Sequence, residues 1–172
     1  MTAPTTTPCE TFLQNIIANW NGSGNVFFPT MSNTVFFNTN MTCAKPNGGK
    51  TVAKFVQTSL ESRHAEKGVG MHYENGFMRC NDAKQLTWML SHNSGNVEAL
   101  SGNVSDDGKS VTLESDTIGG FPETQKTKRT ISFSGENNDE MKYLFYMATL
   151  SVPNVTSHLQ MSFTKIPDEN TK

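Results

Sequence analysis

Cysteine, charge and long apolar runs are all scarce in this 172-residue chain, and each shortage excludes something. Three cysteines occur, Cys9, Cys43 and Cys80, and this odd, sparse count argues against a disulfide framework and for a reducing compartment. Lysine and arginine number 14 against 16 acidic residues, so no basic surplus exists to neutralise a phosphate backbone and we expect no nucleic-acid binding. No apolar run approaches the ~20 residues of a membrane span, so we expect no membrane insertion.

The first residues also lack the parts of an export signal. The segment MTAPTTTPCE has neither a positive region nor an apolar one, and we therefore expect a cytoplasmic protein. Four Asn-x-Ser/Thr sequons are present, which we interpret as chance products of a chain rich in Asn, Ser and Thr; they begin at Asn21, Asn40, Asn103 and Asn154. A secreted glycoprotein is the alternative interpretation.

Familiar catalytic and cofactor motifs are missing as well. No Gly-Lys-Ser/Thr phosphate loop occurs, and GSGNVFFP is not followed by the helix that a dinucleotide-binding loop needs. Neither Cys-x-x-Cys nor His-Glu-x-x-His occurs, so no zinc site is signalled. A Ser-His-Asp triad stays open, because its members need not be neighbours in sequence, but no nucleophile-elbow motif supports one.

What is present is one helical pattern followed by many strand patterns. In CETFLQNIIANW, the apolar residues Phe12, Ile16 and Ile17 recur at helical spacing and predict a short helix that ends near Ala18. Strand-like segments bounded by turn signals follow, at roughly residues 20–28, 32–40, 50–61, 69–79, 85–92, 95–103, 110–118, 123–134, 141–150 and 157–166.

These segments predict an all-β fold. Their mostly hairpin-length connections favour a ten-stranded antiparallel up-and-down β-barrel with a short N-terminal helix over the competing β-sandwich. We expect one domain over residues 9–167, between tails at 1–8 and 168–172. Because a ten-stranded barrel is wider than the eight-stranded barrels that side chains can fill, it should enclose a cavity.

Alternation within the strands assigns an inward face. In QLTWMLSH, His92 shares a face with the apolar residues Leu86, Trp88 and Leu90, so it belongs to the core or to a cavity wall. In KYLFYMAT, Tyr143, Phe145 and Met147 share a face in the same way.

The other three histidines differ in what their surroundings indicate. His64 lies among charges before a turn and should be a surface residue, and His72 on its strand is most simply a structural histidine. His158 shares a strand face with Gln160 and Ser162, while the other face is apolar. If the apolar face points inward, His158 points to water; if His158 points inward, a polar stripe lines the barrel. Periodicity leaves both open.

Four stretches, in order, resemble the nitrobindin family. NWNGSGNVFFPT is similar to its Gly-x-Trp-x-Gly-x-Gly…Tyr-Pro-Thr signature, and MHYENGFMR to its Met-His-x-Glu-x-Gly-Phe/Tyr-x-Arg segment. LSHNSGNVEALSG is similar to its Ser-x-Gln-x-Thr-Gly-x-x-Glu segment, and FYMATLSVPNVTSHLQMSFTKI to its C-terminal Met-Ala-Thr…Pro…His-Leu run. The resemblance implies a barrel shaped like fatty-acid-binding proteins that holds one haem b, with ferric iron, per chain.

The resemblance also implies roles for particular residues. His158 matches the histidine of the His-Leu step, which binds the iron in the family, and is the expected metal-binding and catalytic residue. Thr30 matches the threonine that contacts the haem, and we expect His72, His92 and Met147 to bind the cofactor as well.

Family members bind nitric oxide, and their ferric haem isomerises peroxynitrite to nitrate. The resemblance therefore implies an enzyme, a peroxynitrite isomerase. Two alternatives stay open: a nitric-oxide carrier or sensor without turnover, and a barrel that binds a fatty acid or another apolar small molecule with His158 as a wall residue.

The chain departs from the family pattern at three positions. Ala18 replaces the first glycine of the signature, Phe28 replaces the tyrosine before Pro-Thr, and His92 replaces the glutamine of the Ser-x-Gln segment. His92 matters most, because it places an ionisable, coordinating side chain on a wall that the family pattern implies is largely apolar.

An inward His158 carries a directional expectation for its strand. By regular alternation, Gln160 and Ser162 should then face the cavity with it, while Leu159, Met161 and Phe163 should pack outside.

Overall fold

The computed structural model describes residues 6–27, 34–46, 55–120 and 123–167. Within these residues no helix is long and apolar enough to cross a membrane. The elements are α1 (Pro8–Ile16), β1 (Ala18–Val26), β2 (Val35–Ala44), β3 (Phe55–His64), β4 (Gly70–Cys80), β5 (Gln85–His92), β6 (Val97–Asn103), β7 (Ser110–Gly119), β8 (Thr124–Ser134), β9 (Glu140–Thr149) and β10 (Thr156–Lys165).

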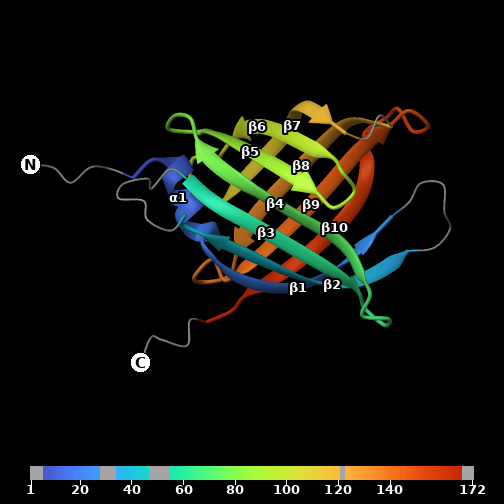
Figure 1. Ribbon diagram of the computed structural model, residues 1–172. Coiled ribbons are helices and arrows are strands. Elements are labelled where there is room, and N and C mark those ends of the chain that lie inside the picture. The colour runs from blue at the N-terminus through green and yellow to red at the C-terminus, as the bar shows by residue number, and fades with distance from the viewer. Residues whose placement is uncertain (1–5, 28–33, 47–54, 121–122, 168–172) are drawn as a thin grey trace, which may run out of the picture.

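The ten strands close into an antiparallel barrel, shown in Figure 1. Each strand pairs with the next along the chain, and β1 closes the barrel against β10, with Trp20 opposite Lys165 and Val26 opposite Leu159. Among the described residues every strand has a neighbour on both sides, although β7 and β8 pair only over Ser110–Glu114. The predicted up-and-down barrel is therefore confirmed and the β-sandwich is excluded. The strands β2 and β3 end four and three residues later than their sequence patterns predicted.

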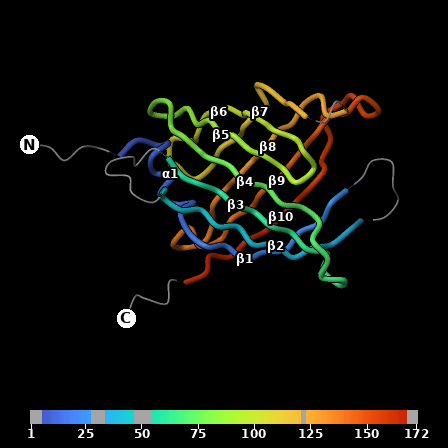
Figure 2. Tube along the Cα trace, in the orientation of Figure 1, coloured from blue at the N-terminus to red at the C-terminus, as the bar shows by residue number. Residues whose placement is uncertain are grey.

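The helix α1 covers one end of the barrel (Figure 2). It begins with a capping box: the Thr7 hydroxyl accepts from the Glu10 backbone N–H, and the Glu10 carboxylate accepts from the Thr7 N–H. Its buried face includes Phe12, whose ring centroid lies 5.3 Å from that of Phe133 in β8. The predicted helix is confirmed, and it ends at Ile16, close to the expected position.

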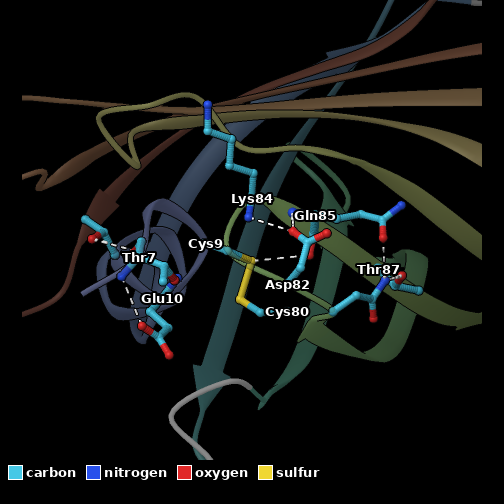
Figure 3. The surroundings of a disulfide bond; sticks show 10 residues. Thr7, Cys9, Glu10, Cys80, Asp82, Lys84, Gln85 and Thr87 are labelled. Atoms are coloured by element: carbon cyan, nitrogen blue, oxygen red, sulfur yellow. Dashed lines mark hydrogen bonds between the residues drawn. A yellow bond between two sulfur atoms is a disulfide. The ribbon is translucent and has the colours of Figure 1, made fainter. Parts of the chain in front are cut away.

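A disulfide ties α1 to the barrel, and the expectation of a chain without disulfides is wrong. Cys9 of α1 and Cys80 at the end of β4 are joined although they lie 71 residues apart in sequence (Figure 3). A cysteine count could not show this, because only closure of the barrel end by α1 brings the two thiols together. Cys43 is buried and free. The cysteine argument for a reducing compartment is therefore removed.

Large side chains fill the part of the barrel next to α1. The Trp20 ring stacks on Phe133 at 5.9 Å and donates its indole N–H to the Ile16 carbonyl at 2.9 Å, which links the core to the helix. Trp88 is also buried and donates to the Thr58 hydroxyl at 3.0 Å. These rings fill the space at this end of the barrel, and their indole N–H groups are hydrogen-bonded. The cavity therefore lies at the opposite end of the barrel.

Candidate functional site

A cavity of about 250 Å³ lies inside the barrel, toward the end away from α1. Its wall is mixed: apolar side chains such as Phe37, Phe145 and Met161 alternate with ionisable ones. Ser94 also lines the cavity, and this exposed residue belongs to the turn between β5 and β6. The cavity therefore reaches solvent beside that turn.

Four of the residues predicted from the sequence meet in this cavity. His72, His92, Met147 and His158 all line it, although they come from four different strands. Thr30 lies outside the described residues, as does Phe28.

Two other sequence expectations concern residues away from the cavity. His64 is not part of the lining; its Nδ1 accepts from the backbone N–H groups of Glu66 and Lys67 in the turn after β3. Ala18 pairs in register with Cys43, so its methyl group leaves the first hairpin regular.

Of the six side-chain directions expected along β10, only that of His158 is right, and a β-bulge is the reason: Gln160 is not part of the cavity lining, and Phe163 is buried in the core instead of packing outside. Ser157 pairs with Tyr146 and Leu159 pairs with Phe145, so the register between β10 and β9 shifts at His158. A bulge resets the alternation of a strand. His158 and Leu159 consequently both line the cavity, together with Met161, while Ser162 is exposed.

The His158 ring is half-buried between the cavity and Phe145, whose ring lies edge-on to it at 5.6 Å. Burial lowers the pKa of His158, a hydrogen bond with the Phe27 backbone partly offsets this, and the charge of His72 on the facing side of the cavity lowers the pKa further. The imidazole is therefore neutral at neutral pH, the form in which a ring nitrogen can bind a metal.

A buried ionic network forms part of the cavity wall across from His158. Arg129 of β8 lies between two carboxylates: its NH1 is 3.1 Å from Glu74 Oε2 and its NH2 is 3.2 Å from Glu98 Oε1. The same guanidinium donates to the Tyr143 hydroxyl and lies over the Phe145 ring at 4.5 Å. All three charged side chains are almost fully buried.

Opposite charges keep this network ionised. Burial alone would raise the pKa of Glu74, but the charge of Arg129 and a hydrogen bond from His72 hold it well below its usual range. Burial would likewise raise the pKa of Glu98, but Arg129 and His92 lower it to about 2. Burial opposes the charge of Arg129 too, and Glu74, Tyr143 and Glu98 together raise its pKa above the ordinary value.

Two of the cavity histidines contact the carboxylates of this network. His72 Nε2 lies 3.3 Å from Glu74 Oε2, and His92 sits between the carboxylates, with Nδ1 3.3 Å from Glu74 Oε2 and Nε2 3.1 Å from Glu98 Oε1. The strand order places β5 directly across the barrel from β10. The wall facing His158 is thus strongly polar, and the implied apolar wall is not what this chain has.

Sequence reasoning missed the network although a signal was available. Glu74 shares its strand face with the buried Met78, Glu98 shares one with Leu100, and Arg129 shares one with Ile131. A charged residue on an otherwise buried face is uncommon unless it is paired. Three such residues in one barrel predict that they meet.

A closed barrel with a solvent-connected cavity lined by aromatic, methionine and histidine side chains is typical of a protein that binds a small molecule. The chain belongs to the family of THAP4-like, heme-binding β-barrel domains, whose family model matches residues 11–165. The resemblance to nitrobindins is thereby confirmed.

Solved structures agree with this fold. Rv2717c from M. tuberculosis has a TM-score of 0.78 and 22% identity, over 95% of this chain and 100% of that one. The S-type phycobiliprotein lyase CPES from Guillardia theta has a TM-score of 0.61 and 9% identity, over 96% of this chain and 100% of that one. At these identities the likeness shows the fold alone.

Proposed function

We propose that this protein binds one haem b in its cavity with His158 as the axial ligand, binds nitric oxide at the iron, and isomerises peroxynitrite to nitrate. Membership of a haem-binding family supports the cofactor. The observation that carries the site is that His158, the residue singled out by the family pattern, faces the cavity at a bulge.

The residues around His158 fit a haem. Imidazole is a good ligand for iron, and the hydrogen bond between the His158 ring and the Phe27 backbone helps to fix the orientation of the ring. Phe145, Leu159 and Met161 give this side of the cavity an apolar surface against which a porphyrin can pack. The opening beside Ser94 lets a large flat ligand be only partly enclosed.

A ferric haem bound there would supply an electron-accepting iron that binds small ligands. The protein's own tasks follow from its side chains. His158 would hold the iron. The apolar side chains of Phe145 and Met147 would shield a bound ligand from water. Peroxynitrite and nitrate are isomers, so the conversion requires no electron donor and no net proton transfer.

His92 gives this chain a group that the family pattern lacks. Its side chain is 5% exposed and lies across the cavity from His158. Both ring nitrogens of His92 face carboxylates, so the residue sets the polarity of the wall that a bound ligand meets, and we expect His92→Leu to change the rate at which nitric oxide leaves the ferric haem. An unchanged rate would place His92 away from the bound ligand.

Stopped-flow decay of peroxynitrite separates the enzyme from the alternatives. We expect the hemin-loaded protein to accelerate the decay and to raise the yield of nitrate, whereas the haem-free protein should do neither. A holoprotein that binds nitric oxide without accelerating the decay would support the carrier or sensor. A protein that gives no Soret band with hemin but binds a fluorescent fatty acid would support the apolar-ligand barrel.

A further inference from the structure

Three side chains on the wall opposite His158 meet at the distances of metal ligands. His72 Nε2 and His92 Nδ1 each lie 3.3 Å from Glu74 Oε2, and one ligand atom from each of the three residues lies within 4.8 Å of the other two. The barrel enforces the arrangement: His72 and Glu74 share a face of β4, and Glu74 pairs directly with His92 of β5.

The distances between these ligand atoms suit a transition-metal ion. Bonds of about 2.0–2.1 Å to nitrogen and oxygen place neighbouring ligands of a tetrahedral ion roughly 3.4 Å apart. Both contacts to Glu74 are already close to this value. Two imidazoles with one carboxylate form a donor set that zinc and divalent iron, copper and nickel favour.

The groups behind these ligands are those that a metal site needs. A metal-bound histidine usually donates its second ring N–H to a carboxylate, and His92 Nε2 lies 3.1 Å from Glu98 Oε1. Glu74 is itself fixed, because Arg129 NH1 and the Tyr143 hydroxyl contact its carboxylate. The orientation of the Glu74 carboxylate is therefore set before an ion arrives, whereas His92 Nε2 lies close to Glu98 without a formed hydrogen bond.

Charge also favours a cation here. Glu74 and Glu98 contribute two negative charges against the single positive charge of Arg129, so these three side chains together carry −1. Arg129 divides its charge between both carboxylates and does not neutralise the wall. His72 is 35% exposed, which leaves this side of the cluster accessible.

We propose that His72, Glu74 and His92 form a binding site for a divalent transition-metal ion, of which zinc and ferrous iron are the chemically closest. Three protein ligands leave further coordination positions open toward the cavity, where water or a small anion can bind. The site goes beyond the proposed haem function, since it uses a separate ion and does not use His158. Loaded together, the two sites would place two metals across one cavity.

Cobalt is the probe, because Co²⁺ bound to nitrogen and oxygen ligands absorbs visible light. The full chain, freed of haem and metal, is titrated with Co²⁺, and Zn²⁺ is then added in competition. We expect one Co²⁺ per chain, displaced by Zn²⁺, and an affinity lowered by about 100-fold or more in His92→Gln and in His72→Gln. Glu98→Gln should lower it by about 10–100-fold, as for other groups that orient a ligand.

The controls separate this site from the haem site. His64→Gln, on the outer turn, should bind Co²⁺ like the wild type and give a normal Soret band with hemin, and His158→Ala should keep its Co²⁺ binding. Far-UV circular dichroism reports whether a variant folds; if His92→Gln does not, His72→Gln decides. The proposal is overturned if the wild type shows no saturable Co²⁺ binding. It is equally overturned if both glutamine variants bind normally, or if His158→Ala removes the binding and they do not.

Discussion

Replacing Arg129 by methionine should destabilise the barrel strongly. The guanidinium is the one positive group that contacts both Glu74 and Glu98 among the described side chains, and each carboxylate is 3% exposed. Without it, two buried negative charges face each other with only the His92 imidazole between them. Breaking a buried ion pair by removing one partner costs about 3–5 kcal/mol. For a domain of this size the loss corresponds to roughly 6–20 °C in melting temperature.

The pH dependence gives this prediction a second, independent test. In the wild type both carboxyl groups have a lowered pKa, so their contribution to stability is present above pH 4.5 and is lost as the pH falls toward about 2. In Arg129→Met the burial that opposes ionisation is no longer offset, which raises both pKa values. Protonation then favours the folded state, so the difference in stability between variant and wild type should shrink as the pH falls from 7 to 4.5.

Urea denaturation of the haem-free protein at a series of pH values measures both effects. Arg79→Met is the matched control, because Arg79 is exposed on β4 and its loss should change the free energy of unfolding by no more than about 0.5 kcal/mol. A loss below about 1 kcal/mol in Arg129→Met, or one that does not vary with pH, would refute the reasoning that opposite charges hold this wall together.

Two further predictions concern the backbone and the disulfide. A Cβ added at Gly76 would lie 2.1 Å from the Met89 carbonyl oxygen, so Gly76→Ala should lower the free energy of unfolding in urea by about 1–3 kcal/mol. A Cβ added at Gly70, on the same strand, meets nothing within 4 Å, so Gly70→Ala should be tolerated. Equal effects of the two substitutions would contradict the close approach of β4 and β5. Reducing the Cys9–Cys80 disulfide opens a loop of 71 residues and should destabilise the protein by about 4 kcal/mol. Amide hydrogen exchange should increase first in α1. Unchanged protection of the α1 amides would show that the disulfide does not hold the helix.

The fold was largely predictable because its signals are local. Apolar alternation in QLTWMLSH and KYLFYMAT, turn residues between the segments and one amphipathic start were enough to predict the helix, the strands and the inward faces. The register of β10 was not predictable, because its bulge at His158 has no glycine or proline to mark it, and regular alternation then assigned Gln160 and Ser162 to the wrong side.

Only those site residues were predictable that a family motif or the alternation within one strand singles out. The family pattern led to His158, and alternation led to His92, and both line the cavity. Charged residues on buried strand faces indicated that Glu74, Glu98 and Arg129 meet, but the contact of Glu74 with Arg129 joins residues 55 positions apart on different strands, so no local pattern identifies the pair. The metal-like cluster of His72, Glu74 and His92 was invisible for the same reason: motif searches look for ligands along one helix or loop, and here two neighbouring strands supply them.

A hemin titration of His158→Ala tests whether His158 is the iron ligand. We predict that the wild type gives a saturable Soret band with one hemin per chain. His158→Ala should lose or severely weaken this band while its far-UV circular dichroism stays that of the barrel. His64→Ala, with the same substitution on the outer turn, should behave like the wild type. A normal Soret band in His158→Ala would contradict the assignment of His158 as the iron ligand.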